Sequence, residues 1–142
     1  MNFFQSIFNN YEKLSKVSYE NIQDILKNND KSYYIINTLN YDLQDILLPN
    51  TINCNEEENI INSLINNSNY NFKIIIYGKN NTDESIYKKY IQLKKYGFTN
   101  MFIYVGGMFE WLLLQDIYGK ELFPTIGFTL NILKYKPDKI IF

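Results

Sequence analysis

Three short apolar runs without alternation between apolar and polar positions divide the chain. They are Tyr33–Asn37, Lys73–Tyr77 and residues 101–105, and the second reads Lys-Ile-Ile-Ile-Tyr. Such a run is typical of a strand buried on both faces of a parallel sheet, because neither face meets water. The pattern therefore predicts three central strands.

Between these runs, apolar residues recur at helical spacing. A helix is predicted at Tyr19–Lys27, with Ser18 as its N-cap. A second is predicted to begin at Asn55, whose side chain would cap a first turn of glutamates, and a third to end at Gly97. Strands that alternate with helices predict an α/β fold, with a mostly parallel central sheet flanked by helices. The apolar positions of the last two helices are Ile60, Ile61, Leu64, Ile65, Ile86, Tyr90 and Leu93.

The links and the two ends of the chain carry weaker patterns. We expect short strands at residues 16–18 and 51–54, a short helix at 41–46 and a turn at 47–50. Residues 1–15 predict an N-terminal amphipathic helix that packs on the domain, with Phe3, Phe4, Ile7, Phe8, Tyr11 and Leu14 on one face. Residues 16–119 would form the main domain. Residues 120–142 would be a C-terminal extension that packs on the domain or on a partner.

Composition places the chain among globular proteins of one domain. It has 142 residues, 46% of them hydrophobic, and a net charge of −1 without a run of basic residues. This charge does not favour binding to nucleic acid. No apolar stretch reaches the ~18 residues that a membrane-spanning helix needs. A single cysteine, Cys54, suits a reducing compartment, so a cytoplasmic location is expected.

Two absences restrict the chemistry available to the chain. It contains no histidine, and all 14 of its basic residues are lysines. The commonest general base near neutral pH and the bidentate guanidinium clamp on anions are therefore missing. Glutamates 56–58 diverge around a helix, so no metal site is expected, and no cofactor is expected either. The abundance of Asn, Ile and Lys is most simply the codon bias of an AT-rich genome.

Several short motifs follow one another along the chain. They are residues 34–39, residues 48–53, Gly97-Phe98, and Gly106-Gly107 with Trp111. Their order resembles the rhodanese homology domain, whose corresponding motifs are an Ile-Asp-x-Arg strand, an Ile-Pro-Gly-Ala-x-Asn segment, Gly-Phe and Gly-Gly-x-x-x-Trp. The run from Gly106 to Gly119 also resembles rhodanese-like proteins of large DNA viruses and some protists. The resemblance covers residues 16–118 and implies a three-layer rhodanese-like fold.

The loop after Tyr77 departs from the family. Sulfurtransferases of this family carry Cys-x-x-Gly-x-Arg there: the thiolate takes sulfur as a persulfide, while backbone N–H groups and Arg hold the anion. In this chain Gly78 stands at the cysteine position, and Asp83 and Glu84 lie near the arginine position. The resemblance thus implies sulfurtransferase ancestry without a catalytic residue, and Asp83, Glu84 and Ser85 are expected to cap the next helix. The degenerate loop consists of Gly78, Lys79, Asn80, Asn81, Thr82, Asp83, Glu84 and Ser85.

The predicted helix at residues 108–118 is apolar on nearly every side. Only Glu110, Gln115 and Asp116 are polar, and a sheet on one side cannot cover such a helix. Either the ends of the chain or a partner must cover the rest. We favour a shared interface, as a homodimer or with another protein. Its expected contact residues are Met108, Phe109, Trp111, Leu112, Leu113, Leu114 and Tyr118.

The favoured hypothesis is a catalytically inactive rhodanese-like domain that binds a protein through this loop and helix. It would act in the cytoplasm, or in the virion if the source is viral. The alternatives are a divergent sulfurtransferase- or phosphatase-like enzyme, or a small-anion binder, using residues 78–85. Cys54 is expected to be a small buried hydrophobe. A position for Cys54 in the anion cradle, close to lysines, would overturn the favoured hypothesis.

Overall fold

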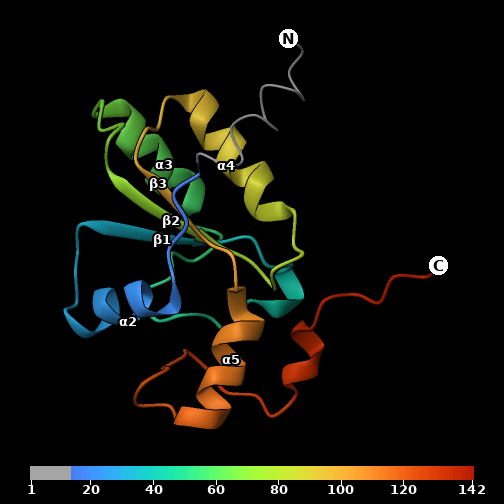
Figure 1. Ribbon diagram of the computed structural model, residues 1–142. Helices are drawn as coiled ribbons and strands as arrows, with labels where there is room; N and C mark the ends of the chain where they lie inside the picture. Colours follow the sequence, from blue (N-terminus) through green and yellow to red (C-terminus); the bar gives the residue numbers. More distant parts are fainter. Residues whose placement is uncertain (1–13) are drawn as a thin grey trace.

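Three parallel strands form the middle layer of the computed structural model, which describes residues 14–142 (Figure 1). They are β1 (Tyr33–Asn37), β2 (Lys73–Tyr77) and β3 (Met101–Tyr104), and β2 lies between the other two. The pairing aligns Ile35 with Ile75 and Ile76 with Ile103. The predicted strands are confirmed, except that β3 ends one residue earlier, because Val105 begins the turn into the next helix.

Helices cover both faces of this sheet. They are α2 (Tyr19–Lys27), α3 (Glu57–Asn66), α4 (Ser85–Tyr96) and α5 (Gly107–Tyr118), with 3-10 turns η1 (Tyr41–Leu43) and η2 (Ile132–Tyr135). Figure 1 shows α3 and α4 on one side of the sheet and α2 and α5 on the other. The predicted α/β fold with a parallel central sheet flanked by helices is confirmed.

Alternate residues of β2 divide the core into two clusters. Ile74 and Ile76 pack with side chains of α3 and α4, such as Leu93. Ile75 and Tyr77 point to the opposite face, where they pack with α2 and with Trp111 of α5. Because both faces of the strand are buried, its sequence shows no alternation between apolar and polar residues.

The predicted helix ends are correct for α2 and α4 and wrong for α3. Ser18 is the N-cap of α2, and Gly97 ends α4 with φ at 110°, in the left-handed region that favours glycine. The predicted cap at Asn55 is wrong, since α3 begins only at Glu57. Asn55 belongs to the preceding turn, where its backbone N–H donates to Asn53 Oδ1 at 2.9 Å.

The short elements predicted between these helices and strands are smaller than expected. Lys16 forms a single bridge with Ile103 and Thr51 a single bridge with Ile35, in place of strands at 16–18 and 51–54. Each segment leaves the sheet at once, because it leads directly into α2 or α3. The helix predicted at 41–46 is reduced to η1, and the turn at 47–50 is present.

The C-terminal residues fold back over α5. The indole Nε1 of Trp111 donates to the Pro124 carbonyl at 2.9 Å, and Gln115 Nε2 donates to the Phe123 carbonyl at 2.7 Å. Phe123 and Tyr135 are buried in the same cluster as Trp111. The apolar outer side of α5 is therefore covered in part by the chain itself.

This cover corrects part of the expected interface. Met108, Trp111 and Leu112 are buried within the chain, so these three side chains are not available to a partner. Phe109 and Leu114 are half-buried, whereas Leu113 and Tyr118 are exposed. Of the two alternatives for α5, cover by the chain's own tail is the one that the structure contains at Trp111, through its contacts with Phe123 and Pro124.

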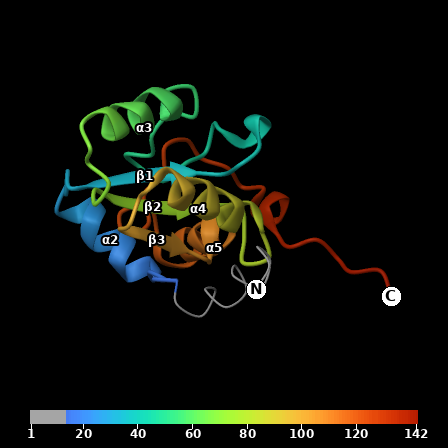
Figure 2. The same ribbon diagram turned by 90° about the horizontal axis from the view of Figure 1, so that it is seen from above.

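The amphipathic helix predicted at the N-terminus lies outside the described residues, except for its last positions. Leu14 is partly buried in the cluster under α3 and α4. No helix within residues 14–142 is long and apolar enough to cross a membrane. Figure 2 shows that the last residues of the C-terminal tail extend away from the body of the domain.

Candidate functional site

The β2–α4 loop, residues 78–84, connects the buried central strand to helix α4. It lies at the carboxyl end of the parallel sheet, where ligands of α/β proteins usually bind. Backbone N–H groups at the start of the following helix could hold an anion at this place. The loop can bind an anion in this way only if these backbone N–H groups are not already bonded to other groups of the chain.

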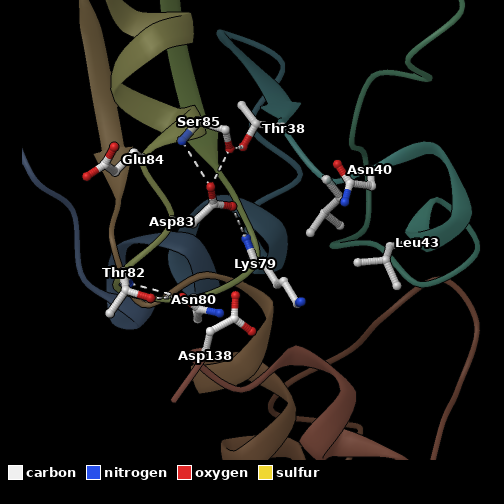
Figure 3. Close-up of a pocket in the computed structure, with 11 residues that line it drawn as sticks. Thr38, Asn40, Leu43, Lys79, Asn80, Thr82, Asp83, Glu84, Ser85 and Asp138 are labelled. Carbon is white, nitrogen blue, oxygen red and sulfur yellow. Dashed lines mark hydrogen bonds between the residues drawn. The ribbon is translucent and has the colours of Figure 1, made fainter. Parts of the chain in front are cut away.

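The Asp83 carboxylate accepts two backbone N–H groups, one in this loop and one at the start of α4 (Figure 3). Its Oδ2 accepts the Lys79 N–H at 2.9 Å, and its Oδ1 accepts the Ser85 N–H at 2.9 Å and the Ser85 hydroxyl at 2.6 Å. The Ser85 hydroxyl also lies 2.7 Å from the hydroxyl of Thr38, which follows β1. Asp83 therefore acts as an internal anion, and the predicted capping of the helix start is confirmed for Asp83.

Asn80 fixes the other half of the loop. Its side chain is buried; Oδ1 accepts from the backbone N–H and hydroxyl of Thr82, and Nδ2 donates to the Tyr135 carbonyl at 2.9 Å. The first N–H groups of α5 also donate into the loop, from Met108 to the Gly78 carbonyl at 3.0 Å. The loop is thus held by α5 and the C-terminal tail as well as by its own side chains.

Gly107 makes this contact between α5 and the loop possible. Its φ is 65°, and a Cβ built on it would lie 2.6 Å from the Gly78 carbonyl oxygen. A larger residue would therefore be strained and would also push α5 away from the loop. The Gly106-Gly107 pair noted in the sequence has a packing role at this point.

Gly78 leaves no space for a side chain at the start of the loop. A Cβ built on Gly78 would lie 2.5 Å from Asp83 Oδ2, 2.8 Å from Thr38 Oγ1 and 3.0 Å from Ile86 Cγ2. The space beside Gly78 is therefore filled by a carboxylate, a hydroxyl and a methyl group.

A polar hollow of about 320 Å³ opens beside the loop. Its lining residues include the acidic Asp83, Glu84 and Asp138 and one basic residue, Lys79. In Figure 3 the Glu84 carboxylate points away from the other lining side chains, whereas Asp83 and Asp138 lie near Lys79. Carboxylates at this place disfavour an anion such as thiosulfate or a phosphate ester. The hollow is also lined by Thr38, Leu39, Asn40, Leu43, Asn80, Thr82 and Ser85.

Five of these lining residues were not predicted as part of the site: Thr38, Leu39, Asn40, Leu43 and Asp138. Thr38 follows β1, and it could have been found from the rule that neighbouring parallel strands end at the same edge of a sheet. Asp138 comes from the C-terminal tail, about 55 residues further along the chain than Asp83. No local pattern marks Asp138, because only the path of the tail brings it to the hollow.

Cys54 lies outside this hollow, in a neighbouring groove of about 480 Å³ between α3 and α4. Lys88 and Lys89 line the same groove, but the Lys89 ammonium group is paired with Glu57 Oε2 at 2.6 Å. Cys54 is half-buried there, which is more exposed than the buried hydrophobe that we expected. The structure does not bring the thiol into the β2–α4 loop.

The buried hydroxyl of Tyr77 at the end of β2 has a structural role. It accepts the Leu48 N–H at 3.2 Å and lies 2.8 Å from the Thr51 hydroxyl. Burial raises the pKa of Tyr77 well above its usual range, so the phenol keeps its proton near neutral pH. Through these contacts with Leu48 and Thr51, the Tyr77 side chain links the segment after η1 to the sheet. Within residues 14–142, no group of three or more acidic or Cys side chains is placed to hold a metal ion.

A model of the rhodanese-like domain family matches residues 19–114. The chain belongs to the rhodanese-like family. The motifs identified in its sequence and its three-layer fold are therefore those of a rhodanese-like domain, as expected. Because its one cysteine is Cys54, no active-site cysteine is evident in this family member.

Solved structures of rhodanese-like proteins share the fold at low sequence identity. The rhodanese-like domain of an Anabaena protein is 17% identical, with a TM-score of 0.57 over 89% of this chain and 86% of that one. Thiosulfate sulfurtransferase from Pseudomonas aeruginosa is 14% identical, with a TM-score of 0.57 over 75% of this chain and 20% of that one.

A Rhodopseudomonas palustris protein of unknown function, described as a possible tyrosine phosphatase, is 12% identical. Its TM-score is 0.54, over 84% of this chain and 92% of that one. At these identities the likeness establishes the fold alone. Curated protein sequences give no match to the chain.

Proposed function

We propose that this rhodanese-like domain lacks sulfurtransferase and phosphatase activity and acts by binding a protein. The observation that carries this proposal is the position of the Asp83 carboxylate, which accepts the backbone N–H groups of Lys79 and Ser85 at the place where an anionic substrate would lie. Rhodanese chemistry requires a thiolate nucleophile and a cradle for an anion in the same loop. Here the loop offers glycine and a fixed carboxylate.

The surroundings of the loop support the same conclusion. Acidic side chains outnumber the one lysine around the hollow, and the chain contains neither arginine nor histidine. A thiosulfate ion would therefore meet repulsion from Asp83 and Asp138 without a guanidinium group to hold it. The conserved architecture of the family remains, whereas the groups that perform its chemistry are replaced.

The alternative of an enzyme that uses Ser85 has one supporting contact. The Ser85 hydroxyl donates to Asp83 at 2.6 Å, an arrangement in which a carboxylate could accept the proton of a nucleophile. However, the same carboxylate also accepts the backbone N–H groups of Lys79 and Ser85, as a residue that caps a helix start does. This contact explains the capping of α4 without any catalytic role.

The test measures turnover of thiosulfate with cyanide and of p-nitrophenyl phosphate, together with mass spectrometry for a persulfide on Cys54. We expect no turnover above a protein-free control and no persulfide. The variants Cys54→Ser and Asp83→Ala should give the same blank result. Turnover that either substitution abolishes would overturn the proposal, because it would place reactive chemistry on the thiol or in the β2–α4 loop.

A further inference from the structure

Exposed large apolar side chains gather at the end of the molecule that contains α5 and the tail. Between residues 14 and 112 the exposed ones are Tyr41 and Tyr96, both of which carry a hydroxyl. From residue 113 onward the exposed ones are far more numerous and mostly aliphatic. We define the α5–tail surface by six of them: Leu113, Ile117, Tyr118, Leu122, Leu130 and Leu133.

These side chains come from elements that pack on one another. Leu113 and Ile117 lie one turn apart on α5, so they share a face of that helix. η2, which carries Leu133, packs directly against α5. In Figure 1, α5 and η2 lie side by side at the end of the molecule that is remote from α3 and α4. The exposed side chains therefore belong to one layer of the fold.

From this surface we infer that the domain forms a homodimer in which the α5–tail surface of one copy packs on that of a second copy. The inference names a partner for the binding module proposed above, and its biological meaning rests on that proposal. A surface that pairs with itself about a two-fold axis has to be complementary to its own copy. The exposed area of this surface and its mixed charge support a pairing of this kind.

The area fits what a stable dimer buries. The six side chains are between 40% and 84% exposed, and together they present on the order of 600 Å². With a polar rim, this approaches the ~800 Å² per partner of a standard stable interface. Isolated apolar side chains on a surface need no partner, whereas several on elements that pack on one another, as α5 and η2 do, favour one.

The charge of the segment also favours a second copy. Residues 113–133 contain three charged side chains, Asp116, Lys120 and Glu121. Because both signs occur, a two-fold partner can set its lysine against an acidic side chain of the first copy. A polyanionic partner or a negatively charged membrane would require an excess of lysine, which this segment lacks.

The N-terminal segment of the same chain is a weaker candidate for this surface. Leu14, where the described residues begin, is partly buried in the cluster under α3 and α4. That cluster lies across the sheet from α5 and the tail. The chain therefore enters the domain on the opposite face.

The test is the molar mass of the full chain in sedimentation equilibrium, from about 1 µM to about 200 µM. We expect a dimer with a dissociation constant of about 10 µM or tighter, little weakened by salt because the contact is apolar. Ile117→Glu, at a position 69% exposed on α5, should raise that constant at least about 30-fold. The matched control is Tyr96→Glu on α4, which should leave it unchanged.

Circular dichroism checks that the Ile117→Glu and Tyr96→Glu variants are folded. Their melting temperatures should equal that of the wild type after correction for the stability that dimerisation adds. Ile117→Lys provides a second variant, because a repeated positive charge across a two-fold axis repels equally well. A monomer at every concentration would overturn the inference, whether or not it binds vesicles of phosphatidylcholine and phosphatidylserine. So would a dimer that neither Ile117 variant weakens. The turnover assay is independent of these measurements, so failure of the dimer and failure of the proposed function are separately visible.

Discussion

The β2–α4 loop and the α5–tail surface differ in how many of their side chains are already bonded or covered by the chain itself. The loop is polar, yet its Asp83 and Asn80 side chains bond to groups of the chain itself. The α5–tail surface is apolar, and side chains such as Ile117 remain largely in water. A site whose donors are already occupied has little left for a ligand, whereas uncovered apolar area gains free energy from any partner that removes it from water. The loop and the surface that we propose for binding are thus different parts of the molecule.

The largest expected effect separates the buried from the exposed side of α5. Trp111→Ala would remove a fully buried indole and its bond to the Pro124 carbonyl, so the free energy of unfolding should fall by about 3–5 kcal/mol. Tyr118→Ala, on the exposed side, should lower it by less than about 1 kcal/mol. Urea denaturation measures both. Equal losses would contradict the division of α5 into a side covered by the tail and a free side.

The next prediction concerns the filled space at Gly78. Gly78→Cys should lower the free energy of unfolding by about 1–3 kcal/mol, because its Cβ would overlap Asp83 and Thr38. The loss should be smaller when Asp83→Ala is introduced first, since one of the two obstacles is then absent. A double-mutant cycle by urea denaturation measures this coupling. Strictly additive effects would show that Asp83 does not fill the place of the side chain at residue 78.

A smaller effect is expected from Asp83 alone. Asp83→Ala leaves the Lys79 and Ser85 N–H groups without their acceptor and should lower the free energy of unfolding by about 1 kcal/mol. Glu84→Ala is the matched control, since Glu84 is exposed and no capping bond of α4 comes from its side chain. Thermal denaturation of both variants measures the two losses of stability. A control as damaging as Asp83→Ala would mean that general charge at the helix start, and not the cap, stabilises α4.

The smallest expected effect is a pH dependence at Glu110. Burial raises the pKa of the Glu110 carboxyl, an effect that its contact with the Tyr104 hydroxyl partly opposes. The folded state therefore favours the protonated form, and stability falls as pH rises through the raised pKa. Glu110→Gln should match the wild type at low pH and become more stable above that pKa, by less than about 1 kcal/mol because the group is partly solvated. A constant difference at every pH would contradict this assignment.

The regular parts of this fold follow from local patterns in the sequence. Lys73–Tyr77 and Tyr33–Asn37 are strands because uninterrupted apolar residues need cover on both faces. Gly97 ends α4 because few other residues accept its positive φ. In the site, the resemblance of the surrounding motifs located the loop, and the acidic residue near a helix start correctly predicted capping by Asp83.

What local patterns could not supply is the path of the tail. The all-round apolar character of α5 showed that a second cover was needed, but it left open whether the tail or another molecule provides it. The bonds from Trp111 to Pro124 and from Asn80 to Tyr135 depend on a chain reversal after Tyr118 that no motif marks. Asp138 reaches the hollow by the same route. Tertiary contacts of this kind are set by the total packing of the chain and not by the residues next to them in sequence.

The bond between Asn80 and the Tyr135 carbonyl has a practical consequence for defining this domain. The match to the family ends at residue 114, yet both this acceptor and the acceptor of the Trp111 indole come from later in the chain. A protein that ends at residue 114 would retain every family motif, but Asn80 Nδ2 and Trp111 Nε1 would lose their hydrogen-bond acceptors. Phe123 and Tyr135, both beyond that limit, are buried in the same cluster as Trp111, so a version of this domain made for experiments should extend past residue 114.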